Sequence, residues 1–232
     1  MKKIIIYIFL GLIWLLPASA KDLFEIINQK EKPKRLLNKD FKNSLSEEIN
    51  SLSIYLGQSK NNEKIPLVDM FYSNLQSNAY KTKEVSVNDD DYFLVSGCRR
   101  QSCGEKALLW IDKKNKIVVG AMIHYFLDTK ESNKLKITKD LVEKYKKRYK
   151  EQWKEELMKA VKESSKDEKY LLIFSKKFDE YKDLPDEYKS ALSNWLSGLT
   201  EYDIATKKDI PLITSIKNFI NSENKRVEIV EN

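Results

Sequence analysis

One stretch of the chain, between Tyr92 and His124, most constrains how the protein can fold. It holds both cysteines, the only histidine and three short apolar runs that are typical of β-strands. The first run stops at Ser96-Gly97, the second covers 107–111 and the third covers 117–123. Because a polar turn separates the second run from the third, the pattern predicts three antiparallel strands joined by one loop and one turn.

The loop between the first two of these strands lies between the two cysteines. Its four residues are polar: Arg99, Arg100, Gln101 and Ser102 stand between Cys98 and Cys103. Cysteines of an exported chain are usually oxidised, so we expect a Cys98–Cys103 disulfide that fixes the loop in one shape. In redox-active cysteine pairs two residues separate the cysteines, whereas four separate Cys98 from Cys103. We therefore do not expect redox catalysis. A rigid loop with two guanidinium groups suits a cleft lined by carboxylates, and a merely soluble surface hairpin is the alternative.

The first twenty residues have the pattern of an export signal. Two lysines precede an apolar run at 4–16, and the small residues Ala18-Ser19-Ala20 follow it. We expect cleavage after Ala20 and a mature protein in the periplasm without a membrane anchor. An uncleaved anchor is the alternative, although the apolar run is short for a membrane span.

The charge of the mature chain is mild. Without Lys2 and Lys3, 40 basic side chains stand against 35 acidic ones, a net +5. The signs alternate along the chain, as they do on solvated helix faces. This argues against a nucleic-acid partner and against docking on anionic lipid or cell wall, both of which need a concentrated patch.

The spacing of apolar residues divides the chain after the export signal into three parts. We expect an N-terminal helical segment at 21–60, a β-sheet core at 61–135 and a largely helical region at 136–232. Expected helices cover 21–57, 139–162, 185–198 and 211–220, with a strand at 84–87 and a closing strand at 226–230. Residues 66–72 fit a short helix or a cap on the sheet, and 170–174 fit a strand or a helix. The predicted fold class is α+β, with a small antiparallel sheet flanked by helices.

Catalytic patterns are weak in this sequence. His124 ends a strand and is not part of any nucleophile motif, so we expect it to be a half-buried strand residue. Once the cysteines are paired, too few ligands remain for zinc, and the glycine-rich phosphate loops are absent. Two of the 35 carboxylates could still meet as a glycosidase pair, but no spacing singles them out. We therefore expect no enzyme, no metal and no cofactor.

A family resemblance connects the landmarks of residues 66–125. They occur in a fixed order: Pro66-Leu67-Val68, Val95-Ser96-Gly97-Cys98, Cys103-Gly104, Trp110, the turn at 112–116, and Gly120. This segment resembles the core of the Ivy family, the periplasmic inhibitors of vertebrate lysozyme. The resemblance implies a protein that blocks a muramidase cleft with the loop between its cysteines.

The loop departs from the family's Cys-Lys-Pro-His-Asp-Cys pattern. Arg99 falls on the family's lysine, Arg100 on the proline, Gln101 on the histidine and Ser102 on the aspartate. We expect Arg99 and Gln101 to contact the target and Arg100 and Ser102 to support them. The partner would be a lysozyme or another peptidoglycan-cleaving enzyme, and a homodimer is left open. The alternatives are an adaptor that binds a protein through its helical C-terminal half, and a cell-wall hydrolase.

Overall fold

The computed structural model describes residues 21–55, 64–76, 85–99, 104–124, 138–164, 169–203, 206–212, 214 and 216–229. The expected export signal therefore lies outside the described residues, and so do Arg100, Gln101, Ser102 and Cys103. Within the described part, no helix combines the length and apolar character that crossing a membrane requires.

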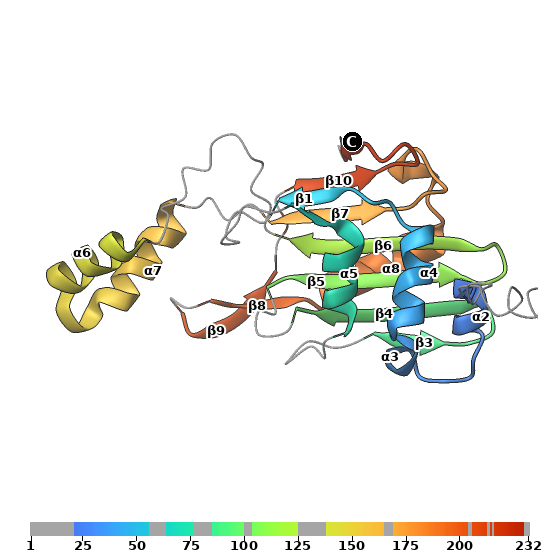
Figure 1. Ribbon diagram of the computed structural model, residues 1–232, viewed down its shortest axis with the longest axis horizontal. Helices are drawn as coiled ribbons and strands as arrows, with labels where there is room; N and C mark the ends of the chain where they lie inside the picture. The colour runs from blue at the N-terminus through green and yellow to red at the C-terminus, as the bar shows by residue number, and fades with distance from the viewer. Residues whose placement is uncertain are drawn as a thin grey trace, which may run out of the picture.

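A seven-stranded sheet forms the centre of the molecule (Figure 1). Its strands are β3 (Ser86–Asn88), β4 (Tyr92–Cys98), β5 (Lys106–Asp112), β6 (Ile117–His124), β7 (Tyr170–Phe174), β10 (Ile216–Ile220) and β11 (Arg226–Glu228). They lie side by side in the order β11-β10-β7-β6-β5-β4-β3. Every neighbouring pair is antiparallel except β7 and β10, which run parallel. The sheet is therefore mixed.

Helices and two small ribbons surround this sheet. The helices are α2 (Leu23–Ile27), α3 (Pro33–Leu36), α4 (Lys39–Glu48), α5 (Leu67–Gln76), α6 (Lys139–Tyr149), α7 (Trp153–Ser164) and α8 (Asp186–Ser197), with 3-10 turns η2 (Lys150–Gln152) and η3 (Tyr181–Asp183). One ribbon pairs β1 (Ser53–Tyr55) with β2 (Lys64–Pro66), and the other pairs β8 (Thr200–Asp203) with β9 (Lys208–Pro211).

The sheet is covered on both faces, which explains why its central strand is apolar throughout. Ala107, Leu109 and Ile111 of β5 belong to the core under α2, α3, α4 and α5. Leu108 and Trp110 of the same strand belong to a second core under α8. Successive side chains of a strand point to opposite faces, so a strand between two helical layers must be apolar at every position. Figure 1 shows α4 and α5 crossing one face of the sheet and α8 behind the other.

The prediction of a small antiparallel sheet and a largely helical C-terminal region is wrong. The sheet has seven strands and is mixed, and three of them (β7, β10 and β11) come from residues after 136. Helices α2 to α5 lie in the N-terminal third, so the helices are not mainly C-terminal. The expected helix at 211–220 is replaced by β10, which pairs with β7, and the expected helix at 21–57 ends at Glu48.

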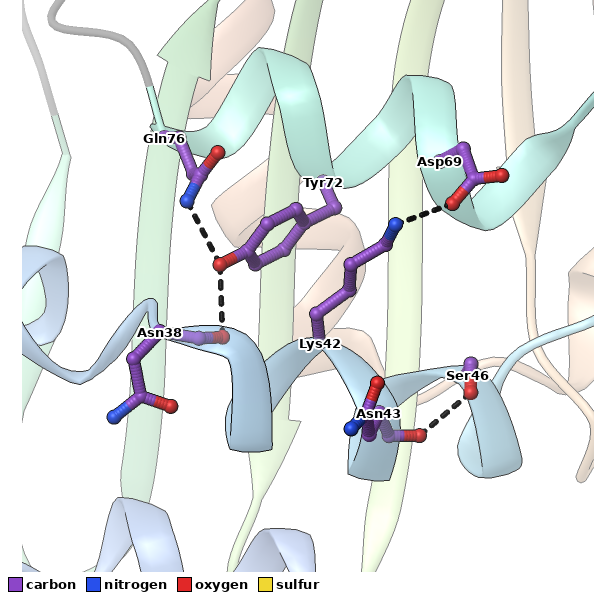
Figure 2. A network of polar contacts seen from close by, with 7 residues as sticks. All are labelled: Asn38, Lys42, Asn43, Ser46, Asp69, Tyr72 and Gln76. Carbon is purple, nitrogen blue, oxygen red and sulfur yellow. Dashed lines mark hydrogen bonds and ion pairs between the residues drawn. The ribbon is translucent and has the colours of Figure 1, made fainter.

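Polar contacts fasten the two main helices of the N-terminal layer to each other (Figure 2). The hydroxyl of Tyr72 on α5 donates to the backbone oxygen of Asn38 at 2.8 Å, and Gln76 Nε2 donates to that hydroxyl at 2.8 Å. Lys42 of α4 pairs with Asp69 of α5 at 2.6 Å. Burial raises the pKa of Tyr72, against a smaller lowering by the Gln76 hydrogen bond, so Tyr72 is a neutral donor. This layer is fixed where it covers the sheet.

One helical hairpin stands apart from the rest. Helices α6 and α7 pack on each other through η2, and Figure 1 shows them clear of the sheet. They lie in the connection between β6 and β7, which are antiparallel neighbours. The predicted helix at 139–162 is thus confirmed in outline but broken at Lys150, where the backbone has a positive φ of 48°. No residue of α6 is buried, so Tyr145 and Tyr149 are not part of the core.

Candidate functional site

The loop between β4 and β5 lies at one end of the sheet, and the resemblance landmarks lie on the strands around it. The segment 95–98 is in β4, Trp110 in β5 and Gly120 in β6, so the three predicted antiparallel strands are confirmed. Ser96 has a clear structural role: its Oγ accepts a hydrogen bond from the Val85 N–H at 2.9 Å. Of the four predicted loop contacts, the structure describes Arg99 alone.

Three charged or titratable side chains form a row across β4, β5 and β6 at the base of this loop. Cys98 lies opposite Lys106, and Lys106 lies opposite Ile123. One residue further along, the same register brings together Arg99, Glu105 and His124. Alternation along the strands places this row on the face that α5 covers.

Glu105 is the centre of the row. Arg99 Nη1 donates to Glu105 Oε2 at 2.8 Å, and His124 Nδ1 lies 2.8 Å from Glu105 Oε1. The backbone N–H of Arg99 also donates to the backbone oxygen of Glu105 at 3.0 Å. The Glu105 side chain is 8% exposed and His124 is fully buried, whereas Arg99 is 43% exposed. The row therefore runs from the interior of the sheet to the surface.

The electrostatics of the row favour an ionised carboxylate. Burial alone raises the pKa of Glu105, but hydrogen bonding and charge interaction with His124 and Arg99 outweigh it and lower that pKa below its usual value. A buried carboxylate with two cationic or donor partners is stable only while both contacts persist. The loop ends are therefore fixed to each other by a backbone hydrogen bond and by a buried charge.

This arrangement fits a structural support better than a catalytic centre. A general base must reach the proton that it removes, and a fully buried imidazole cannot do so. The expectation of a half-buried His124 is thus wrong: the side chain is fully buried and contacts Glu105. No group of three metal-ligating side chains occurs among the described residues.

The expected disulfide can be followed only at Cys98. Cys98 ends β4 with its side chain buried and is disulfide-bonded, and no described cysteine is free. Cys103, the other cysteine of the sequence, lies outside the described residues. The loop base is held in addition by Arg99, Glu105 and His124.

Glu105 and its pairing with His124 are the functional features that sequence reasoning missed. A signal was present: Glu105 directly precedes an apolar strand, where an acid needs a partner if it points into the core. The partner could be found only from the strand register, because His124 lies at the far end of the next strand, β6.

Comparison of the chain with protein-family models, with curated proteins and with solved structures gives no match.

Proposed function

We propose that the protein is a non-catalytic inhibitor of lysozyme type, exported to the periplasm, whose β4–β5 loop occupies the cleft of a peptidoglycan-cleaving muramidase. The supporting observation is the Arg99–Glu105–His124 row, which contacts both ends of this loop. A loop with fixed ends loses less conformational freedom on binding than a free one. The resemblance of residues 66–125 to the Ivy family points to the same loop.

The proposal assigns the contacts by chemistry. Muramidase clefts carry a pair of carboxylates, and an arginine fork matches a carboxylate with two parallel hydrogen bonds. Because the Arg99 guanidinium already binds Glu105, we assign the leading contacts to Arg100 and Gln101. Ser102 follows them in the sequence and supports them, and Arg99 supports the loop while its exposed donors face the target.

The direct test is a titration of c-, g- and i-type lysozymes with the mature protein, followed by the clearing of a cell-wall suspension. We expect one class to be inhibited at micromolar protein. The double variant Arg100→Ala/Gln101→Ala should inhibit at least tenfold less, since a hydrogen bond to a charged group contributes about 1.5–3 kcal/mol.

The matched control removes the same side chains elsewhere. Gln29→Ala/Arg35→Ala changes one exposed glutamine after α2 and one exposed arginine in α3, both far along the chain from the loop. It should inhibit like the unmodified protein. Full activity of every lysozyme class at micromolar excess would overturn the proposal.

The alternative function, an adaptor, has less helical surface for a partner than the sequence suggested. It assumed a helical C-terminal half, but three strands of the sheet come from that half. Among the helices that the structure describes, only the α6–α7 hairpin offers a surface away from the sheet. An adaptor of this kind should keep its partner in the Arg100→Ala/Gln101→Ala variant.

A further inference from the structure

The α6–α7 hairpin carries a concentrated basic run that the loop function does not use. From Lys144 to Lys150 the sequence reads Lys-Tyr-Lys-Lys-Arg-Tyr-Lys, with five basic residues, two tyrosines and no acid. All five basic residues are exposed. Over residues 139–150, six basic side chains stand against two acidic ones, a local net +4. The charges that alternate along most of the chain are thus segregated here.

The basic residues of α6 flank an apolar stripe. At helical spacing the partly exposed residues Leu141, Val142, Tyr145 and Tyr149 share one side of α6, and the two tyrosine rings are 5.2 Å apart. The same spacing places Lys144 and Arg148 along one edge of this stripe and Lys146 along the other. The helix is therefore amphipathic, with cations on both edges of its apolar side.

Several cations of the hairpin lie over its aromatic rings. The Lys146 and Lys154 ammonium groups are 5.3 Å and 5.7 Å from the centroid of the Trp153 ring, and the Arg148 guanidinium is 5.3 Å from the Tyr149 ring. Lys146 also pairs with Glu143 within the helix at 2.8 Å. Tryptophan and tyrosine beside lysine and arginine are the side chains that prefer the headgroup region of a bilayer.

The hairpin leaves much of this stripe uncovered. Leu157 of α7 is buried, but no residue of α6 is, and Met158 on α7 is 50% exposed. The hairpin also lies in the connection between two antiparallel neighbours, β6 and β7, whose pairing needs only a short turn. The hairpin is therefore not needed to connect the two strands, and it has an exposed surface separate from that of the sheet.

We propose that the α6–α7 hairpin docks on an anionic phospholipid surface. Lys144 and Arg148 on one edge of the stripe and Lys146 on the other bind lipid phosphates, and the partly exposed tyrosines and Trp153 lie at the level of the headgroups. Clusters of four to eight basic residues on amphipathic helices are typical of such binding. A nucleic acid would match the charge but not the apolar stripe, which favours lipid. This surface works independently of the β4–β5 loop.

The test compares vesicle binding by the mature chain and two charge-matched variants. Vesicles contain either phosphatidylcholine alone or equal parts of phosphatidylcholine and phosphatidylglycerol, and bound protein is measured by co-sedimentation. Lys144→Glu/Lys146→Glu/Arg148→Glu reverses three charges of the run, all on the edges of the apolar stripe. Lys30→Glu/Lys32→Glu/Arg35→Glu reverses two exposed lysines and one exposed arginine near α3. Far-ultraviolet circular dichroism and thermal melting confirm that each variant is folded.

We expect the mature chain to bind the anionic vesicles and not the neutral ones. The hairpin variant should bind on the order of a hundredfold more weakly and the control variant within about threefold, from the contribution of each basic residue near an anionic surface. Both variants should keep their lysozyme inhibition, so the loop function and this inference fail separately.

Three results would overturn the inference. They are equal vesicle binding by the two triple variants, no binding of the mature chain to anionic vesicles, and tighter binding to an oligonucleotide or to polyglutamate than to the vesicles at the same salt concentration. The last result would assign the run to a soluble polyanion instead of a lipid.

Discussion

Gly120 of β6 lies against the aromatic ring of Phe174 on β7, its partner in the strand register. A Cβ placed on Gly120 would lie 2.1 Å from Phe174 Cε2, far inside van der Waals contact. The same ring packs edge-to-face on Phe71 of α5, with centroids 4.8 Å apart. The missing side chain of Gly120 thus lets a ring from β7 reach the helix that covers the sheet.

Gly120→Ala should therefore destabilise the protein by about 1–3 kcal/mol, because a methyl group inserted into a packed core forces its neighbours to move. Urea unfolding at neutral pH measures the change. Gly198→Ala is the matched control, since its nearest atom to an added Cβ is 3.6 Å away and the same substitution there should be nearly neutral. Phe174→Leu should partly rescue Gly120→Ala, and a Gly120→Ala protein as stable as the unmodified one would contradict this packing.

Glu105→Gln should destabilise the fold by about 3 kcal/mol at neutral pH, because it removes the charge that a buried imidazole and a guanidinium share. The pH dependence has a definite sign. The pKa of Glu105 is lower in the folded protein than its ordinary value of 4.5, so its contribution is fully present above that value and is lost as pH falls through the folded pKa.

Urea unfolding at a series of pH values between neutral and acid should then show a smaller loss of stability toward acid in Glu105→Gln than in the unmodified protein. The control Glu180→Gln removes an exposed partner of Lys182 and should give no measurable change in stability. Parallel curves for Glu105→Gln and the unmodified protein would contradict an ionised Glu105.

Lys150→Gly should stabilise the α6–α7 hairpin. Lys150 has φ 48° and ψ −117°, a conformation that glycine adopts without strain, so the gain is on the order of 1 kcal/mol. Amide hydrogen exchange of 139–164 should slow. Lys147→Gly removes the same charge inside α6 and should have the opposite effect, by about 1 kcal/mol. Faster exchange in Lys150→Gly would mean that this turn is not strained.

Deletion of 138–164, with a short Gly-Ser link in its place, should leave the sheet folded. The reason is that α6 and α7 pack mainly on each other and not on the sheet. We expect near-unchanged cooperative unfolding, full lysozyme inhibition and no binding to anionic vesicles. An unfolded or aggregating deletion would show that the hairpin is part of the core.

The sequence predicted the local elements better than the sheet. The β4–β5–β6 meander follows from alternating and continuous apolar runs with clear breaks, and the helix at 185–198 is confirmed as α8. Residues 216–220 were predicted to be helical because their apolar residues are spaced by three and four, as on one side of a helix. They form β10 because β7 offers a parallel partner, and no local pattern encodes a partner so far along the chain.

In the candidate site, too, local features could be predicted from the sequence and contacts between strands could not. The position of the loop could be predicted from its flanking strands, whereas the Glu105–His124 pair depends on which residues oppose each other across strands. The basic run of α6 was visible in the sequence. A charge balance taken over the whole chain hid it, because acidic residues elsewhere offset its five cations.

The position of the hairpin between β6 and β7 also affects how the chain is made. Strands β3 to β6 leave the ribosome first, and the strand that covers the edge of β6 follows only after residues 125–169. At ordinary synthesis rates this leaves the hydrogen-bonding edge of an apolar strand open for roughly two to nine seconds. Open edges of this kind recruit other strands. A newly made chain should therefore depend on a chaperone until β7 has been synthesised.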